Sequence, residues 1–213
     1  MHLLVAAGIS VLPTSGMRCL GYRLLFGYQI RNARLGFGTI ILVRKASLDG
    51  CRIGKFNRFI GPMTVSIGRN TEIGPLNEFT CGYWTLSEES SHSAYRRHLE
   101  VGEDVVVTTH HHFDVAGALV VGSRSWIAGR GSQFWTHGAG VTDRNISIGN
   151  DCYISSAVRF APGSGVCDNC LVGLGSVVVG AIEETHALIA GVPAKVLKRD
   201  YDWKSRNEEA VLS

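Results

Sequence analysis

Two segments of the sequence place histidine among other side chains that could take part in proton transfer. The first is His110-His111-His112-Phe113-Asp114 and the second is Phe134-Trp135-Thr136-His137-Gly138. A neutral imidazole, with an ordinary pKa of about 6.5, can take a proton from a hydroxyl at neutral pH. Neither segment pairs its histidine with a nucleophilic serine or cysteine in a recognisable turn. The residues therefore favour direct transfer of a group to a hydroxyl over a covalent enzyme intermediate.

The cysteines and the overall charge limit the other kinds of chemistry. The chain has six cysteines, and Cys167 and Cys170 form a CxxC pair. Both fall at regular positions of the repeat described below, so packing explains them better than zinc binding or redox activity. Reduced thiols predict a cytoplasmic protein. The formal net charge of +3 is mild, and the basic clusters are too short to predict nucleic-acid binding.

The elements that must position these residues follow a step of six. Apolar residues occupy every sixth place of the clearest stretch: Ile148, Ile154, Phe160, Val166, Val172 and Val178. This period fits neither a helix nor a simple strand, and it is typical of a parallel β-helix built from hexapeptide rungs. Three rungs close one triangular coil of about 18 residues, with the apolar position pointing inward.

The same step is looser in the first half of the chain. It is followed by Ile53, Phe59 and Val65; by Ile67, Ile73 and Phe79; by Val101, Val107, Phe113 and Leu119; and by Val121, Ile127 and Gln133. Two segments depart from it, at about 86–98 and at 136–147. We expect the first to be an inserted loop, because long loops on a regular scaffold are often functional.

The two ends of the chain do not follow the repeat. Apolar residues at helical spacing in 16–30 predict an amphipathic helix that covers the open end of the coil. The apolar stretch 2–12 is too short to span a bilayer and lacks a signal peptide's basic start. It is interpreted as a packing segment, with a membrane-surface anchor as the alternative. We thus expect a helical cap at 1–38, a β-helix at 39–198 and a helical tail at 199–213.

The C-terminal part of the repeat resembles a known family. Val172-Gly173-Leu174-Gly175-Ser176-Val177-Val178, followed by Ala190-Gly191-Val192-Pro193-Ala194-Lys195-Val196, is similar to the C-terminal signature of the hexapeptide-repeat acyltransferases. This family includes galactoside, maltose, serine and polysaccharide O-acetyltransferases. The match is tight over 121–198 and looser over 53–119. The resemblance implies an all-β solenoid, a left-handed parallel β-helix, which departs from the usual right-handed crossover rule. It also implies a homotrimer with active sites between subunits and acetyl-CoA as donor.

The resemblance also assigns the catalytic base, and its partners are expected on the preceding coil. His137 stands where the family places its histidine and is the expected general base. His112 and Asp114 are its expected catalytic partners, while His111 and Trp135 are expected to contact the acceptor. One rung cannot point three successive side chains the same way, so at most two of the histidines can face the site. An exposed polar corner for His110–Asp114, and packing between subunits for Trp135, are the alternatives.

The residues expected to bind acetyl-CoA come from later coils. By resemblance they are Tyr153, Ser156, Gly173, Leu174 and Gly175 along the pantetheine, with Lys195 and Lys198 at the phosphates. Many relatives have Thr-Lys where this chain has Val179-Gly180. This chain therefore lacks one cofactor contact of the family.

The sequence predicts an acetyl-CoA-dependent O-acetyltransferase of polysaccharide biosynthesis that acts on a hydroxyl of a sugar or glycan precursor. It is expected to be a cytoplasmic homotrimer without a bound metal, nucleic-acid partner or stable membrane insertion. Three alternatives remain. They are N-acetylation of a nucleotide-linked amino sugar, a zinc enzyme like the γ-class carbonic anhydrases, and a catalytically silent solenoid. The paired histidines of the zinc enzymes are absent from the clean repeats.

Overall fold

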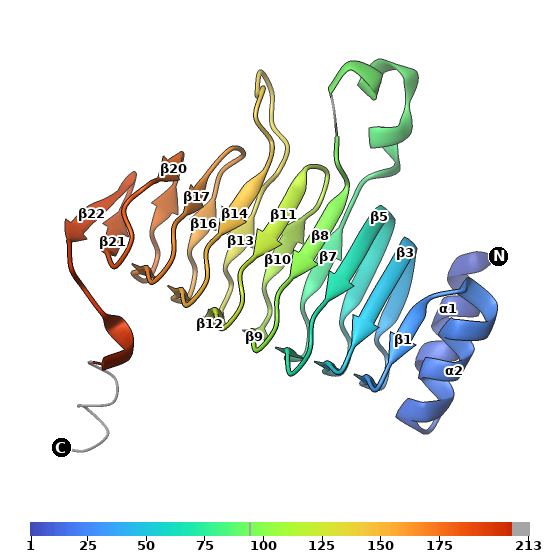
Figure 1. The fold of residues 1–213 in the computed structure, drawn as a ribbon. Helices are drawn as coiled ribbons and strands as arrows, with labels where there is room; N and C mark the ends of the chain where they lie inside the picture. Colours follow the sequence, from blue (N-terminus) through green and yellow to red (C-terminus); the bar gives the residue numbers. More distant parts are fainter. Residues whose placement is uncertain (94, 206–213) are drawn as a thin grey trace.

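The chain forms a coil of short parallel strands that is closed at its N-terminal end by two helices (Figure 1). The computed structural model describes residues 1–93 and 95–205. Each turn of the coil contributes one strand to each of three faces. The apolar residue of each rung points inward, because only one side of each short strand faces the interior.

The strands of the first face share one sheet in sequence order. They are β2 (Arg34–Leu35), β4 (Arg52–Ile53), β6 (Glu72–Ile73), β9 (Val106–Thr109), β12 (Trp126–Arg130), β15 (Tyr153–Ile154), β18 (Leu171–Val172) and β21 (Leu188–Gly191). The final strand, β22 (Ala194–Lys198), runs antiparallel to β21 and ends the sheet.

The second and third faces are joined because two long strands bend around the corner between them. These are β3 (Ile40–Asp49) and β5 (Arg58–Ile67). The second face continues with β7 (Glu78–Thr80), β10 (His112–Asp114), β13 (Gln133–Phe134), β16 (Arg159–Phe160) and β19 (Val177–Val178). The third face contains β1 (Gln29–Arg31), β8 (His98–Val101), β11 (Ala118–Val121), β14 (Ile146–Ile148), β17 (Gly165–Val166) and β20 (Ala181–Ile182).

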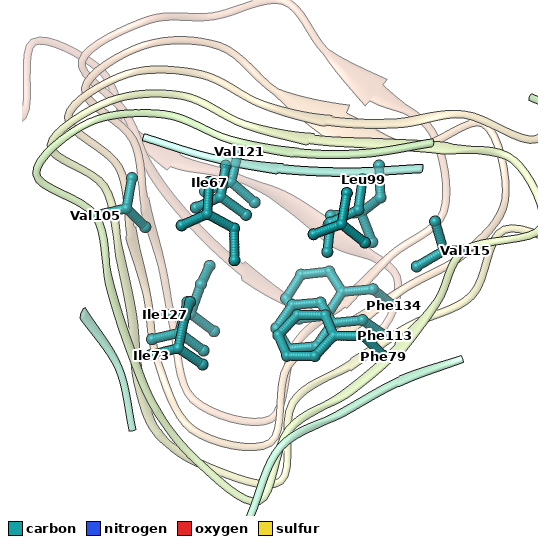
Figure 2. Close-up of a cluster of buried hydrophobic side chains, with 14 of the residues drawn as sticks. Ile67, Ile73, Phe79, Leu99, Val105, Phe113, Val115, Val121, Ile127 and Phe134 are labelled. Carbon is teal, nitrogen blue, oxygen red and sulfur yellow. The ribbon is translucent and has the colours of Figure 1, made fainter. Parts of the chain in front are cut away.

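Figure 2 looks along the coil and shows the three stacks of apolar side chains that fill it. The chain passes from Leu99 through Val105 and Phe113 to Val115, anticlockwise as it recedes, so the coil is left-handed. On the second face the phenylalanines form one continuous ring stack. Centroid distances between neighbouring rings are 4.3 Å (Phe59–Phe79), 4.4 Å (Phe79–Phe113), 4.6 Å (Phe113–Phe134) and 5.1 Å (Phe134–Phe160). The expected left-handed β-helix is confirmed.

One interior position differs from the expected step of six. Phe134, and not Gln133, pairs with Phe113 and Phe160 and is fully buried. The register of β12 against β9 shifts between Ile127 and Arg130, which adds one residue before the next corner. A strand residue moved by one place points to the opposite side, so Gln133 faces outward.

The helical cap is shorter than expected. Helix α1 (His2–Ser10) and helix α2 (Ser15–Phe26) lie on the first coil, and the strands begin at Gln29, well before residue 39. Thr14 caps α2 by accepting a hydrogen bond from the Met17 amide at 3.2 Å. No helix within the described residues is both long and apolar enough to cross a membrane. At the other end, 203–205 begin a helical turn, and the rest of the expected tail, 206–213, lies outside the described residues.

Two segments project from the corner between the second and third faces (Figure 1). The first joins β7 to β8 and contains two 3₁₀ helices, η1 (Tyr83–Leu86) and η2 (Glu88–Ser93). It is the inserted loop expected at 86–98, although it leaves the coil already after Thr80. The second joins β13 to β14. Between them, β10 passes directly into β11 through a short corner that begins at Asp114. Three successive coils therefore meet at this corner.

Candidate active site

The projecting corner holds a histidine–carboxylate pair. Asp114 is the last residue of β10, and His137 lies three residues beyond the end of β13, on the next coil. The His137 Nδ1 atom lies 2.8 Å from Asp114 Oδ2. The side chain of Asp114 is 5% exposed and that of His137 is 39% exposed. A buried carboxylate thus holds an imidazole that reaches the surface.

Neighbouring groups fix the position of the carboxylate. Asp114 Oδ2 also accepts hydrogen bonds from the Thr136 amide at 2.8 Å and the Thr136 hydroxyl at 2.7 Å. The buried Thr136 hydroxyl in turn accepts a bond from the Gly117 amide at 2.9 Å. Because a carboxylate only accepts, Nδ1 of His137 carries the proton. In the neutral ring Nε2 is then the atom with a lone pair, as a general base requires.

Aromatic rings surround this imidazole. The centroid of the Trp84 ring lies 5.3 Å from that of His137, and the Trp135 ring lies 6.2 Å from it. Tyr95 packs edge-on against Trp84 at 5.2 Å, and the guanidinium of Arg144 lies 4.6 Å from the Tyr95 ring centre. The two projecting segments therefore meet around His137.

Trp84 was not foreseen from the sequence. It lies before the segment that breaks the step of six, and its place beside His137 depends on how the loop folds back. Thr85 fixes that fold, because its buried hydroxyl donates to Gly82 O at 2.7 Å while Arg97 Nη1 donates to Thr85 O at 3.0 Å. The signal in the sequence was an aromatic residue next to an irregular segment, which indicates a surface loop but gives no direction.

His112 lies near the pair without touching it. Its ring centroid is 4.7 Å from that of Trp135, and its Nδ1 lies 3.6 Å from Glu78 Oε2. Trp135 thus stands between His112 and His137. The structure brings Asp114, Trp135 and His137 together and places His112 behind Trp135.

His111 lies inside the coil at a different corner, between the first and second faces. There the Asn57, Asn77 and His111 side chains follow one another on successive coils. Asn57 Oδ1 accepts from the Asn77 amide at 2.8 Å, and Asn77 Oδ1 accepts from the His111 amide at 2.9 Å. His111 Nδ1 continues the series by accepting from the Ser132 amide at 3.1 Å.

Burial defines the protonation state of His111. The residue is 2% exposed, and desolvation lowers its pKa from 6.5 to about 4, with a smaller contribution from the neighbouring His110. Its Nε2 lies 2.9 Å from Thr108 Oγ1, to which the neutral ring donates. The neutral His111 ring therefore continues the ladder of buried side chains that Asn57 and Asn77 begin at this corner. This interior position does not support the contact between His111 and the acceptor substrate that the sequence suggested.

The residues expected to bind acetyl-CoA lie at the corner between the first and second faces. Leu174 and Gly175 form an open turn: Leu174 is 73% exposed and nothing lies within 4 Å of a Cβ added to Gly175. In contrast, a Cβ added to Gly173 would meet Ala190 at 3.0 Å. Lys195 and Lys198 are exposed on β22. These groups share the C-terminal end of the coil, away from the corner of His137.

Two of the expected cofactor contacts already have partners. The Tyr153 ring packs between Trp126 at 5.5 Å and Trp203 at 5.2 Å. Trp203 is held there because its Nε1 donates to Asp151 O at 2.7 Å. Ser156 Oγ accepts from the Arg130 amide at 3.3 Å. Leu174 and the two lysines are the exposed members of the set, whereas Tyr153, Ser156, Gly173 and Gly175 are half-buried.

The described residues contain no group of three or more His, Cys, Asp or Glu side chains arranged to hold a metal ion. The thiols of the CxxC pair are not activated, since burial raises the pKa of Cys170 to about 11 and also raises that of Cys167. A cavity of about 540 Å³ lies elsewhere, beside the end of helix α2.

No protein-family model matches the chain, and no curated protein matches it. Among solved structures the chain is similar to the polySia-specific acetyltransferase NeuO, with 17% identity, 87% of this chain and 94% of that chain covered, and a TM-score of 0.45. A hexapeptide-repeat acetyltransferase from Vibrio cholerae O1 biovar eltor, complexed with acetyl coenzyme A, matches at 17% identity, with 92% and 83% covered and a TM-score of 0.43. A UDP-N-acetylglucosamine acyltransferase matches at 14% identity, with 86% and 76% covered and a TM-score of 0.49. At these identities the likeness is one of fold.

Proposed function

We propose that the chain is an acetyl-CoA-dependent O-acetyltransferase that modifies a hydroxyl of a sugar or glycan precursor. The observation that carries the proposal is the contact of 2.8 Å between His137 Nδ1 and the buried Asp114 carboxylate. It orients an imidazole that reaches the surface, and it leaves Nε2 as the proton acceptor. We further propose a homotrimer in the cytoplasm that serves polysaccharide biosynthesis, as the resemblance of the sequence implies.

The chemistry proposed for His137 is general base catalysis. Acetyl-CoA would supply the acetyl group as a reactive thioester. Nε2 of His137 accepts the proton of the acceptor hydroxyl while the hydroxyl oxygen forms its bond to the acetyl carbon. The carbon–sulfur bond then breaks, and the imidazolium returns the proton to the departing thiolate. Asp114 stabilises the positive charge that His137 carries between these two steps.

The aromatic rings around His137 support a sugar as the acceptor. Sugar rings present C–H faces that pack on flat aromatic side chains, and their edges carry hydroxyls for hydrogen bonding. Trp84 and Trp135 stand on two sides of His137, at centroid distances of 5.3 Å and 6.2 Å. Trp84 is 45% exposed and Trp135 is 36% exposed, so both rings are accessible. They are the proposed walls of the acceptor site.

The placement of the cofactor residues supports a site shared between copies of the chain. Leu174 and Gly175 stand at one corner of the triangular coil, and His137 stands at the next corner. A second copy packed alongside would bring its turn at 173–175 toward His137, and three copies would close the arrangement. The open turn suits the pantetheine chain, and Lys195 and Lys198 provide positive charge for the phosphates.

The test is transfer from acetyl-CoA labelled in its acetyl group, scanned over sugars, nucleotide-linked sugars, amino sugars and simple alcohols. We expect labelled ester in at least one sugar and none with His137→Ala. Labelled amide with an amino sugar would indicate N-acetylation at the same site. A folded protein that fails to bind acetyl-CoA, or a His137→Ala variant of full activity, would contradict the proposal. Sedimentation equilibrium measures the expected trimer.

A further inference from the structure

The two N-terminal helices expose apolar side chains on the outside of the cap. Figure 1 shows the helices at the end of the coil, with one side on the first strands and the other uncovered. The side chains that are more than half exposed include Leu3 and Leu4 of α1 and Leu20, Leu24 and Leu25 of α2. Leu20 and Leu24 are one helical turn apart and so lie on one side of α2. Together these five leucines form the cap surface.

Helix α1 lacks the polar side expected of a helix in contact with water. From Leu3 to Ile9 it contains only Leu, Val, Ala, Gly and Ile. A helix that is apolar on every side is normally buried on every side. Here only Ala6, Ile9 and Ser10 are buried, against Tyr22 and strand β3. The opposite side of α1 is therefore apolar without a covering layer in the described part of the chain.

Positive charge predominates at this end of the molecule. Residues 1–48 contain six Arg and Lys and no Asp or Glu, whereas the remainder of the chain contains 15 Arg and Lys and 18 Asp and Glu. Five of the six are exposed: Arg23, Arg31, Arg34, Arg44 and Lys45. Within the described residues none of these five forms an ion pair, whereas Arg52, Arg58 and Arg69 on the following coils each form one. The five side chains therefore carry unpaired positive charge in the described structure, although Asp49, which pairs with Arg69, lies opposite Arg31 on β3.

A groove connects the apolar and basic features. The cavity of about 540 Å³ lies where α2 ends, and the residues that line it include Phe26 and Tyr28 as well as Arg44, Lys45 and Ser47. Arg44 and Lys45 are exposed at the bend of strand β3. An acidic group on a flexible stem would find an apolar wall and two cations here.

We infer that the N-terminal cap binds the surface of an anionic lipid bilayer. The leucines of the cap surface enter the boundary between headgroups and acyl chains, as the apolar side of an interfacial helix does. Arg44 and Lys45 contact lipid phosphates, and the other exposed arginines of residues 1–48 add long-range attraction. A second copy of the chain is a poorer occupant of the same surface, because it presents the same unpaired positive charges. This association lies in the plane of the bilayer surface and needs no spanning segment.

The test is co-sedimentation of the full chain with vesicles. One set contains phosphatidylcholine alone and the other also contains phosphatidylglycerol. We expect binding to the anionic vesicles that weakens as salt is raised, because the attraction to the surface is screened. The Arg44→Gln/Lys45→Gln variant should bind more weakly by more than about tenfold, since each basic residue near the surface contributes about fivefold. Equal binding of the natural chain to both vesicle types, or no binding, would overturn the inference.

A matched pair of variants distinguishes lipid binding through the cap from nonspecific binding through any exposed apolar side chain. Leu24 is 73% exposed on α2, and Leu197 is 62% exposed on β22 at the opposite end of the coil. Leu24→Glu should weaken vesicle binding by about tenfold or more, since it removes a leucine from the interface and adds a negative charge. Leu197→Glu should bind as the natural chain does. Equal losses in both variants would contradict the assignment to the cap. Gel filtration without lipid tests whether a second copy of the chain covers the cap surface instead. A complex that Leu24→Glu dissociates and Leu197→Glu does not would show that a second copy, and not the bilayer, binds there.

Discussion

The corner that carries His111 and the corner that carries His137 use the same side chain in opposite ways. At the first, His111 continues a ladder of buried side chains and is neutral because desolvation lowers its pKa to about 4. At the second, His137 reaches the surface and is held by a buried carboxylate. The two corners differ in what the chain does next. At the first the strands turn directly, whereas at the second two coils extend into projecting segments. In this chain, the histidine that can react with a substrate is the one at the corner where the coil extends into projecting segments.

The largest difference between the two corners should be seen in the transfer rate. His137→Ala is expected to lower kcat by about 10²-fold to 10⁴-fold, because it removes the general base. His111→Asn should leave the rate within a few-fold of the natural chain. Steady-state kinetics with labelled acetyl-CoA measures both. A larger loss in His111→Asn than in His137→Ala would reverse the assignment of the two histidines.

A smaller effect is expected when the carboxylate behind His137 is changed. Asp114→Asn keeps the size of the side chain and an oxygen for the Thr136 amide, but it removes the negative charge that faces His137. We expect kcat to fall by about 10²-fold because the ring loses its orientation and the stabilisation of its charge. The KM for acetyl-CoA should not change. A variant in which only KM changes would indicate that Asp114 serves binding instead.

Substitutions of His111 should change the free energy of unfolding. His111→Ala removes the acceptor of the buried Ser132 amide and leaves space behind, so the free energy of unfolding should fall by about 2–4 kcal/mol. His111→Asn restores the side chain that Asn77 provides one coil earlier, and it should lose about 1 kcal/mol or less. Urea unfolding followed by circular dichroism compares the two variants. Equal losses would show that the ladder does not depend on an acceptor at this position.

The same histidine gives a pH dependence of known sign. Its pKa is about 4 in the folded chain and 6.5 as an ordinary value, so the unfolded state binds the extra proton between these pH values. The stabilisation is fully present above about pH 6.5 and is lost as the pH falls toward 4, by up to about 3 kcal/mol. His111→Asn should lose less stability over this range than the natural chain. Parallel pH dependences of the two proteins would contradict a neutral His111.

The sequence predicted the fold well because the coil is specified locally. Each rung places one apolar residue inward, and an error in one rung does not spread to the next. The exception at Phe134 shows the limit, since the register shift in β12 moves the interior position by one residue and no spacing rule signals it. The site was predicted less completely. Asp114 was expected near His137 because it lies on the preceding coil, and Trp135 because it is two residues from His137 in the sequence. Trp84 instead depends on the tertiary fold of its loop.

His111 shows why residue type alone misleads. It follows a histidine and precedes another, and the three point in different directions because the chain turns at His110, whose backbone φ is +57°. The sequence indicated that not all three could face one site. It could not show that the middle one replaces an asparagine in a ladder of the interior, because that ladder is formed by side chains on the two preceding coils and a backbone amide on the next coil.

The corner of the two projecting segments also lies at a fixed distance along the coil axis from the basic residues of the first coil. Arg44 and Lys45 stand at this corner on the first coil, and the bend of β5, the loop after β7 and the end of β10 separate them from His137. Each step between neighbouring strands is about 4.8 Å, so His137 stands about 19 Å further along the axis. Inserting or deleting one whole turn of the coil between Lys45 and His137 would therefore change the axial distance between them by one such step, without altering the chemistry at His137.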